Sequence, residues 1–526
     1  KINFKITNMK NKSVQKNNMH EEKIEILMNW IRNNRIFVHS SIALSKQDDK
    51  VPKNVILSPK TSKLSYILSN SKIPDILNLC IAYMYEKNLG QKSLWYGYLQ
   101  IMPEKVDIPK LWDDEKNWLK GTEIEYIGGL DITELHQAYE NLIRPFIKEN
   151  KKILDPNIFT YNNFLKAISV VRSRAFEIDN FHGLGLVPFA DMFNHTSTKE
   201  HIHFQTFYEV CSSCGSAYCC NTEHLQKNSY INSSINYIKN QLSKTNNYKK
   251  NELFYDTCDM VIYNSPSSLD EIFNTYGSHG NDVLLSRYGF SIPQNKWDRI
   301  TMSKTIEKKY IKSDRLSWWK LHGFNISYQM NFFQKYFSND DIKNYINQCN
   351  SNHNYTDVCS CQKNKYLFLQ DSLFLAFPSI PSQSLIFFIT LLSLNNKLFE
   401  KLKKNIKNTI AFILNIIKLQ TFFFSTGSIK KFKYQKHITL LIIFKINKIL
   451  LNSINNRLKK YNQTLNLDFI YENTETQIKN YRKKWTKIVL QNELNILNNT
   501  QKKCINIINI TKSILKQKKL YLLKNI

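Results

Sequence analysis

The sequence lacks the glycine-rich and serine-centred motifs that mark several large enzyme classes. It has no G-x-x-x-x-G-K-[ST] phosphate loop, no G-x-S-x-G turn, and no G-x-G-x-x-G segment after an apolar strand. A P-loop nucleotide hydrolase, an α/β-hydrolase and a dinucleotide-binding fold are therefore not indicated.

Disulfide frameworks, long apolar runs and export signals are also missing. The ten cysteines are mostly scattered over 526 residues, a pattern typical of a reducing compartment. The longest apolar run, Leu385–Leu394, contains Thr and Ser and is about half a bilayer span. The polar opening KINFKITNMKNKSVQKNN shows no signal peptide. We therefore expect an intracellular protein, in the cytoplasm or nucleus, that does not associate with a membrane.

Positive charge is abundant and unevenly distributed. The formal net charge is +30, and residues 401–526 carry 26 Lys and Arg against four acidic residues, an excess of +22. Such a field would attract an acidic protein, a nucleic acid or an anionic membrane. The alternative is a composition that has drifted toward Lys and Asn on solvated surfaces, without a functional partner.

Periodicity predicts an α+β fold in which strands are interrupted by helices and followed by a helical region. An amphipathic pattern favours helices at His20–Asn34 and Tyr161–Phe176. Short β-branched runs predict strands within residues 35–64 and 183–277. The predicted division is a disordered segment at 1–20, a mixed domain at 21–296 with a helical insertion at about 73–170 and a low-complexity insertion at about 211–250, and a helical domain at 297–526.

Three short islands stand out from this composition. They are SRAF (Ser173–Phe176), PFADMFNH (Pro188–His195) and EIFNTYGSHGNDVLLSRYGF (Glu271–Phe290). Taken singly, each fits a locally paired turn or ordinary core aromatics. In this order and spacing they resemble the SET-domain protein methyltransferases of the Rubisco large-subunit methyltransferase type. The segment at Leu458–Asn499 is similar to the helical substrate-binding domain of that class.

The resemblance implies S-adenosylmethionine as the cofactor and assigns five residues to its site. Asn194 and His195 would hold the cofactor, partly through backbone groups that read the adenine, and Asp191 would support their loop. Arg174 would grip the cofactor's carboxylate, a task suited to a guanidinium fork, while Phe176 packs nearby.

Two tyrosines would carry the chemistry, which the resemblance implies is methyl transfer to a lysine ε-amine in a protein. Tyr276 would be the catalytic tyrosine and would also contact the cofactor, and Tyr288 would line the channel for the substrate lysine. A dry tyrosine-walled channel would favour the neutral amine. The alternatives are a histidine methyltransferase of the same fold, and an inactive SET module that binds protein or RNA.

The helical domain from about residue 300 onward would choose the protein substrate, and its charge suits an acidic one. We expect no specific nucleic-acid binding, and the oligomeric state is open. The sequence departs from the family at two places. The turn at Asn33–Ser41 contains no glycine, and Gly280-Asn281 follow the YG segment where the family commonly has Ser-Asn.

A cysteine cluster invites a zinc interpretation. Its members are Cys211, Cys214, Cys219, Cys220 and His224, and the C-x-x-C spacing suits one edge of a tetrahedral site. The second cysteine pair is adjacent, however, and the cluster lies in the low-complexity insertion. We therefore predict a reduced loop and no metal.

Overall fold

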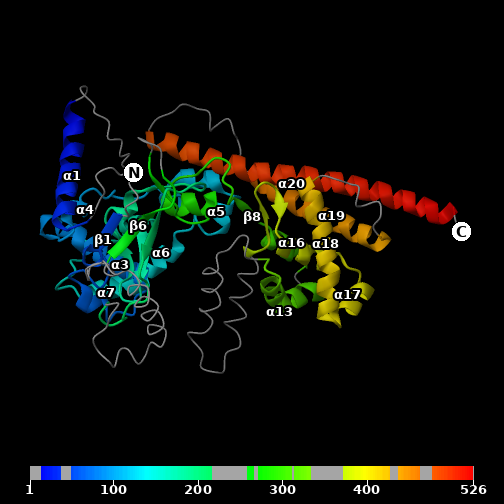
Figure 1. Cartoon of the computed structure of the whole chain (residues 1–526), viewed down its shortest axis with the longest axis horizontal. Helices are drawn as coiled ribbons and strands as arrows, with labels where there is room; N and C mark the ends of the chain where they lie inside the picture. Colours follow the sequence, from blue (N-terminus) through cyan, green and yellow to red (C-terminus); the bar gives the residue numbers. More distant parts are fainter. Residues whose placement is uncertain are drawn as a thin grey trace, which may run out of the picture. The chain divides into compact units, whose positions relative to one another are not determined.

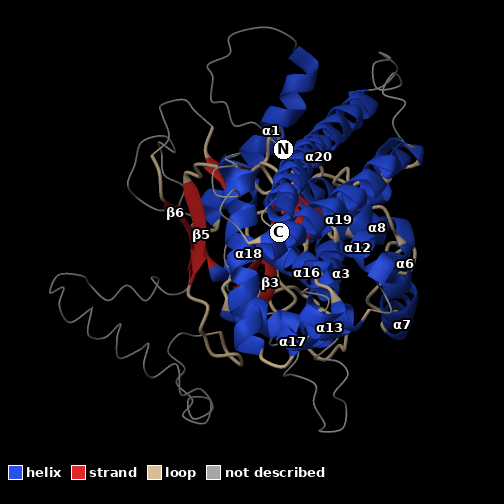
Figure 2. Ribbon diagram, turned by 90° about the vertical axis from the view of Figure 1, so that its right-hand side faces the viewer, coloured by secondary structure: helices blue, strands red, loops and turns tan. Residues whose placement is uncertain are grey.

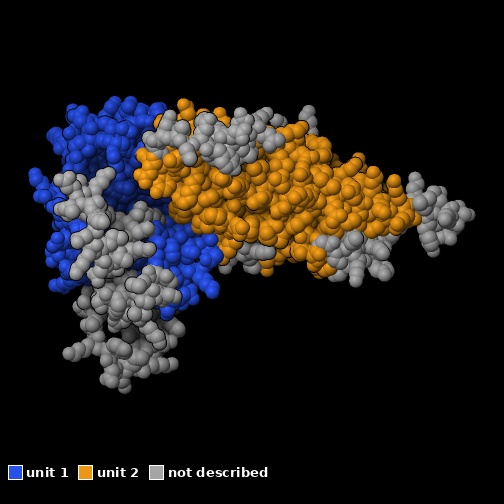
Figure 3. All heavy atoms as spheres, turned by 90° about the horizontal axis from the view of Figure 1, so that it is seen from above, with its two compact units in different colours: residues 1–111, 131–277, 287–289 blue, residues 112–130, 278–286, 290–526 orange. Residues whose placement is uncertain are grey.

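The chain folds into two compact units, neither of which is continuous in sequence (Figure 3). Unit 1 comprises residues 1–111, 131–277 and 287–289, and unit 2 comprises 112–130, 278–286 and 290–526. The computed structural model describes residues 14–36, 49–215, 257–265, 271–310, 313–332, 371–426, 436–462 and 477–524. The domain boundary at 296/297 stays a prediction.

Unit 1 is built on a five-stranded sheet with the strand order β1-β6-β5-β7-β4. The antiparallel pair β5–β6, labelled in Figure 2, supplies its longest strands, with Phe204 opposite Met260. A separate hairpin is formed by β2 and β3. The strands are β1 Asp49–Pro52, β2 Ala175–Asp179, β3 Gly183–Leu186, β4 Asn194–His195, β5 Ile202–Thr206, β6 Thr257–Ile262 and β7 Phe273–Asn274.

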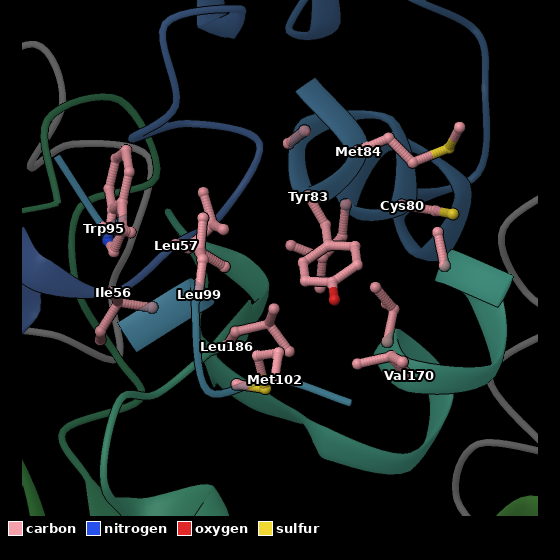
Figure 4. Packing of buried hydrophobic residues seen from close by; sticks show 14 of the residues in the cluster. Ile56, Leu57, Cys80, Tyr83, Met84, Trp95, Leu99, Met102, Val170 and Leu186 are labelled. Atoms are coloured by element: carbon pink, nitrogen blue, oxygen red, sulfur yellow. The ribbon is translucent and has the colours of Figure 1, made fainter. Parts of the chain in front are cut away.

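The helices of unit 1 pack on each other and on these strands. They are α1 Val14–Asn33, α2 Ser65–Leu68, α3 Asp75–Asn88, α4 Tyr96–Leu99, α6 Thr133–Ala138, α7 Arg144–Glu149 and α8 Tyr161–Arg174. Cys80 and Tyr83 of α3, Val170 of α8 and Leu186 of β3 belong to one buried cluster (Figure 4). The mixed helix and sheet content confirms the predicted α+β class.

Two boundaries differ from the expectations. Helix α1 begins at Val14, so residues 14–20 are helical and not part of a disordered segment. Each residue that extends an existing helix adds one backbone hydrogen bond, whatever its side chain. The polar residues 14–20 can therefore continue the amphipathic helix toward the N-terminus. The predicted helix at Tyr161–Phe176 ends at Arg174, and Phe176 lies in β2. Residues 1–13 and 37–48 lie outside the described residues.

Gly97 is required where α1 meets α4. A Cβ atom at this position would lie 2.3 Å from the Cβ of Trp30, a distance that no side chain tolerates. Because glycine has no Cβ, the Trp30 side chain fits here, and its ring stacks on Tyr98 with a centroid separation of 6.4 Å. The contact thereby fixes Tyr98, a side chain that reappears in the candidate site.

Unit 2 is mostly helical. Its longer helices are α12 Ser303–Tyr310, α13 Asp314–Gln329, α16 Gln383–Ser393, α17 Asn396–Lys403, α18 Ile406–Thr426, α19 His437–Asn462 and α20 Gln477–Lys524. Its shorter elements are η4 Asp114–Leu119, α5 Glu123–Tyr126, α11 Asn281–Val283, β8 Arg299–Thr301, β9 Phe374–Ala376 and β10 Ile380–Pro381. Helix α16, labelled in Figure 1, is buried on all sides and contacts α13, α18 and α19. It contains residues 385–393 of the predicted apolar run and lies in the core of the unit.

Two helices of unit 2 are long and apolar enough to cross a membrane by length and composition alone. They are α18 and residues 437–461 of α19, with 39% and 44% of the apolar windows buried inside the fold. Core helices of soluble proteins have the same composition. Between the two helices, Gln420 Nε2 donates to Asn447 Oδ1 at 2.9 Å, and Asn447 donates back at 3.2 Å. The expectation of no membrane association stays a prediction.

A buried cluster of charges joins the segment 112–130 to α19 and α20. Arg457 Nη2 lies 2.6 Å from Glu123 Oε1, and both side chains are at most 5% exposed. Glu493 accepts from the Glu123 backbone N–H at 3.1 Å and from the Tyr461 hydroxyl. Two buried carboxyl groups thus face one guanidinium. Burial raises the pKa of Glu493 well above its ordinary value and that of Glu123 to about 7.

The cluster predicts a pH-dependent gain in stability for Glu493→Gln. Folding raises the pKa of both carboxyls, so the stability that their protonated forms contribute is present at acid pH and is lost as pH rises through the folded-state pKa, which is about 7 for Glu123 and well above its ordinary value for Glu493. The variant removes one ionisable group and keeps its shape. From about pH 5 to about pH 8 we expect the free energy of unfolding to shift in its favour by about 1–2 kcal/mol relative to wild type.

Guanidinium titrations at several pH values measure this difference. Other groups face the carboxyl pair too: Asp282 raises the pKa of Glu123, and a hydrogen bond from Thr301 lowers it. The matched control is Glu400→Gln, whose half-exposed carboxylate pairs with Lys403 at 3.2 Å on α17. It should show no such shift. A flat or opposite trend for Glu493→Gln would contradict the prediction.

Candidate functional site

The end of the second sequence island and the start of the third, residues 271–277, lie side by side in unit 1. The pair β4–β7 is parallel, with Asn194 opposite Phe273 and His195 opposite Asn274. The Thr196 backbone N–H continues the pairing by donating to the Asn274 carbonyl at 2.9 Å. Two segments about 80 residues apart therefore cross at the Asn-His pair, which explains why polar residues end the apolar run before them.

Tyr276 is held at this crossing at both ends. Its backbone N–H donates to Nδ1 of the buried His195 at 2.9 Å, and its hydroxyl donates to the Phe193 carbonyl at 2.8 Å. The His195 and Tyr276 ring centroids are 5.1 Å apart. Gly277 follows with φ 115°, a conformation that favours glycine, so the chain can turn away directly after Tyr276.

Tyr288 lies against Tyr276. The two ring centroids are 4.7 Å apart with the planes tilted by 33°. Burial raises the pKa of the Tyr288 hydroxyl, and Arg287 offsets only part of that effect, so the group is protonated at neutral pH. The structure thus brings together His195, Tyr276 and Tyr288 as one wall of aromatic rings.

Arg174 and Asp191 form a second part of the site. Arg174 Nη1 lies 2.8 Å from Asp191 Oδ2 and 3.1 Å from the Asp191 carbonyl, so the end of α8 is tied to the PFADMFNH segment. The Tyr98 hydroxyl donates to the same carboxylate oxygen at 2.9 Å. The turn before Asp191 is strained, since Phe189 has φ 74° in a residue other than glycine. Strain of this kind persists where surrounding contacts enforce it.

Phe176 and the side chain of Asn194 lie outside these two groups. Phe176 stacks on Phe204 with centroids 4.5 Å apart, so its ring packs on β5. The Asn194 side chain donates to Glu271 Oε1. Asn194 therefore reaches the crossing through its backbone, by way of β4.

Similarity to known proteins agrees with this geometry. No protein-family model matches the chain. It is 28% identical over 350 residues to ribosomal lysine N-methyltransferase 3 of Saccharomyces cerevisiae, covering 55% of this chain and 63% of that protein. It is 24% identical over 261 residues to N-lysine methyltransferase setd6 of Salmo salar, covering 46% and 47%. The chain thus spans about half to two thirds of the length of these relatives.

A solved structure decides the fold. The crystal structure of the SET domain of LSMT bound to lysine and AdoHcy aligns with a TM-score of 0.51 at 14% identity, covering 95% of this chain and 92% of that one. The chain has the SET-domain fold of the LSMT class. The fold expected from the three islands is therefore confirmed.

Two contacts of this SET-domain chain were not predicted. Tyr98 lies in the helical insertion, where its spacing does not distinguish it from Tyr96, yet it is fully buried against Asp191. Glu271 precedes β7, and only the strand pairing brings it to Asn194. In the sequence, Tyr98 has the pattern of an ordinary core tyrosine. Glu271 opens the third island, but nothing in its pattern indicates a partner.

The zinc alternative and the glycine-free turn fall mostly outside the described residues. Of the cysteine cluster only Cys211 and Cys214 are described, one buried and one exposed. Within the described part of the SET-domain chain, no three metal-ligating side chains gather. The absence of a metal stays a prediction.

Proposed function

We propose that the chain is an S-adenosylmethionine-dependent protein-lysine N-methyltransferase. The observation that carries the proposal is the placement of Tyr276, whose ring packs between His195 and Tyr288 while its hydroxyl is fixed on the Phe193 carbonyl. Such a rigid hydroxyl beside the protonated, largely buried Tyr288 suits transfer of a methyl group at a preorganised, dry position. The names of the relatives, lysine methyltransferases, support it.

The described residues fit the cofactor. Arg174 Nε and Asp191 Oδ1 are buried and have no hydrogen-bond partner among the described residues, so each can still bind a ligand. Arg174 would hold the cofactor's carboxylate through the side of the guanidinium that Asp191 leaves open. Asn194 and His195 would contact it from β4. When bound, the cofactor supplies an activated methyl group, so these residues need only position the reactants.

The aromatic wall would act on the substrate amine. Tyr288 and Tyr276 offer ring faces that attract a cation, and their half-buried setting disfavours the charged ammonium form. The neutral amine is the form that can accept a methyl group. The Tyr276 hydroxyl oxygen can accept weak C–H contacts from the methyl group in transit. Phe176, stacked on Phe204, would act by packing alone.

The partner we propose is a protein, and the +22 excess at 401–526 favours an acidic one. The similarity to setd6 and to ribosomal lysine N-methyltransferase 3 supports an intracellular setting, in the cytoplasm or the nucleus. We propose no specific nucleic-acid partner.

The test is incubation of the full chain with radiolabelled S-adenosylmethionine and cell lysate. Acid hydrolysis of the labelled protein then identifies the modified residue. Labelled methyl-lysine supports the proposal, and labelled methyl-histidine would favour the histidine methyltransferase. Calorimetry measures cofactor binding separately. Binding without labelling of any protein would favour the inactive SET module.

Tyr98→Phe is expected to weaken cofactor binding through Arg174. The change removes one of two hydrogen bonds to a buried carboxylate, which costs about 1.5–3 kcal/mol of stability. With Asp191 less constrained, we expect KM for the cofactor to rise roughly tenfold while kcat changes less. The control is Tyr208→Phe, which removes an exposed hydrogen bond to Glu177 of 3.1 Å. Equal effects of the two variants would contradict the prediction.

A further inference from the structure

A polar groove runs between α12 and α19 within unit 2. Its volume is about 320 Å³, and its lining is rich in amide and ammonium groups. The residues that matter here are Thr305, Lys309, Asn452, Asn455, Asn456 and Lys459. No carboxylate lines it among the described residues. Its apolar lining, Ile306, Ile449 and Tyr310, belongs to the core of the unit, whereas none of the residues assigned to methyl transfer lies in the groove.

The groove residues follow the helix period. Asn452, Asn456 and Lys459 are exposed and lie four and three positions apart, so they share one face of α19. Thr305 and Lys309 are spaced by four on α12 and present a second row. The result is an amide-lined channel with an ammonium group on each helix.

Most of these polar atoms are open to a ligand. Among the described residues, the side chains of Asn452, Asn456 and Lys459 make no hydrogen bond or ion pair. Asn455 differs, because its Oδ1 accepts from Gln501 Nε2 at 2.8 Å, which anchors the floor of the groove on α20. The Lys309 ammonium lies 5.9 Å from the Tyr310 ring and has no carboxylate partner in the described part of the chain.

The chemistry of the lining selects the ligand. A primary amide both donates and accepts, so a row of asparagines matches the alternating N–H and C=O groups of an extended peptide. Two ammonium groups that have no carboxylate partner in the described part of the chain match the carboxylates of an acidic ligand. Single-stranded nucleic acid would instead call for a row of stacking aromatics, and Tyr310 is the single aromatic residue among the described lining.

We propose that the α12–α19 groove docks an extended acidic segment of the protein substrate, outside the site where the methyl group is transferred. This inference rests on the proposed function, because only a protein methyltransferase has a protein substrate to dock. Asn452 and Asn456 would hold the peptide backbone, and Lys309 and Lys459 would bind its carboxylates. Binding in this groove would then let the basic helical region select acidic substrate proteins over neutral or basic ones.

Fluorescence anisotropy of the full chain with labelled oligoglutamate tests the groove directly. We expect Lys309→Ala/Lys459→Ala to weaken binding by roughly tenfold, since two modest charge pairs are lost. The matched control is Lys512→Ala/Lys516→Ala, two exposed lysines on α20 that remove the same charge. Equal weakening by the two pairs would mean that only net charge attracts the peptide, and would overturn the proposal.

A second pair of variants tests the amides. Asn452→Asp/Asn456→Asp places two carboxylates in the groove and should weaken oligoglutamate binding more than Asn495→Asp/Asn499→Asp, an exposed pair on α20. Thermal melts check that all variants fold. Oligouridylate of equal length is the competing probe. Tighter binding of oligouridylate that is lost in the Lys309/Lys459 variant would assign the groove to RNA and overturn the peptide assignment.

The two proposals can fail independently. If lysate proteins are labelled but oligoglutamate binding ignores the groove variants, the groove assignment is wrong and the methyltransferase stands. If no protein is labelled while oligoglutamate binding depends on Lys309 and Lys459, the groove stands as a peptide site and the proposed function fails. With both supported, the groove variant should raise KM for an acidic substrate far more than the α20 control.

Discussion

Replacing Tyr276 by phenylalanine is expected to reduce methyl transfer by about 100-fold or more while cofactor binding persists. The change removes only the hydroxyl, which lies 2.8 Å from the Phe193 carbonyl, and keeps the ring between His195 and Tyr288. Loss of one preorganised polar group at a reacting centre typically lowers kcat by about 10²–10³. The measurement is kcat with radiolabelled donor, alongside calorimetric cofactor affinity.

Unit 1 offers a closely matched control. The Tyr139 hydroxyl donates to the Phe159 carbonyl, also at 2.8 Å and also in a tyrosine-to-backbone bond. Tyr139→Phe should therefore cost the same stability, about 1 kcal/mol, and leave turnover near wild type. Wild-type turnover in Tyr276→Phe, or equal loss in both variants, would remove Tyr276 from its assigned role.

Arg457→Met is expected to destabilise unit 2 by about 3–5 kcal/mol. Arg457 pairs with Glu123, and Glu493 accepts from the Glu123 backbone N–H. Removal of Arg457 therefore leaves two buried carboxyl groups without the guanidinium that they face. Chemical denaturation monitored by circular dichroism measures the loss. It should be largest above about pH 7, where the Glu123 carboxyl ionises in the folded state.

Two further variants separate charge from packing. Adding Glu123→Gln to Arg457→Met removes one of the stranded carboxyl groups and should recover part of the stability. Arg144→Met disrupts a half-exposed ion pair with Glu140 and should cost less than about 1 kcal/mol. If the double variant is no more stable than Arg457→Met, lost packing and not stranded charge explains the effect.

The fold was predictable where its signal is local. The alternation in HIHFQT predicted β5, and the apolar run at Leu385–Leu394 became the buried helix α16. The division into units was not predictable, because segment 112–130 is bound to α19 by Glu123 and Arg457, which are 334 residues apart. A buried ion pair between such distant residues leaves no periodic trace in the sequence.

The residues of the candidate site were predicted from the resemblance to a known family, and not from composition, periodicity or spacing. The islands named Arg174, Asp191, His195 and Tyr276, and the structure brings Arg174 to Asp191 and His195 to Tyr276. Tyr98 was missed because a buried tyrosine in a helical pattern is ordinarily a core residue. Its hydroxyl becomes meaningful only once Asp191, 93 residues further along, packs against it.

The parallel pairing of β4 with β7 also constrains the order in which the protein can mature. Tyr276 contacts His195 and Phe193 across 81 and 83 residues, and Tyr288 completes the wall later still. Closing such long loops costs entropy before any contact compensates, so these contacts form late. A nascent chain that has not yet presented Tyr288 can have its early helices packed and still have no aromatic wall. On the proposed function, methyl transfer would therefore begin only after synthesis has passed that residue.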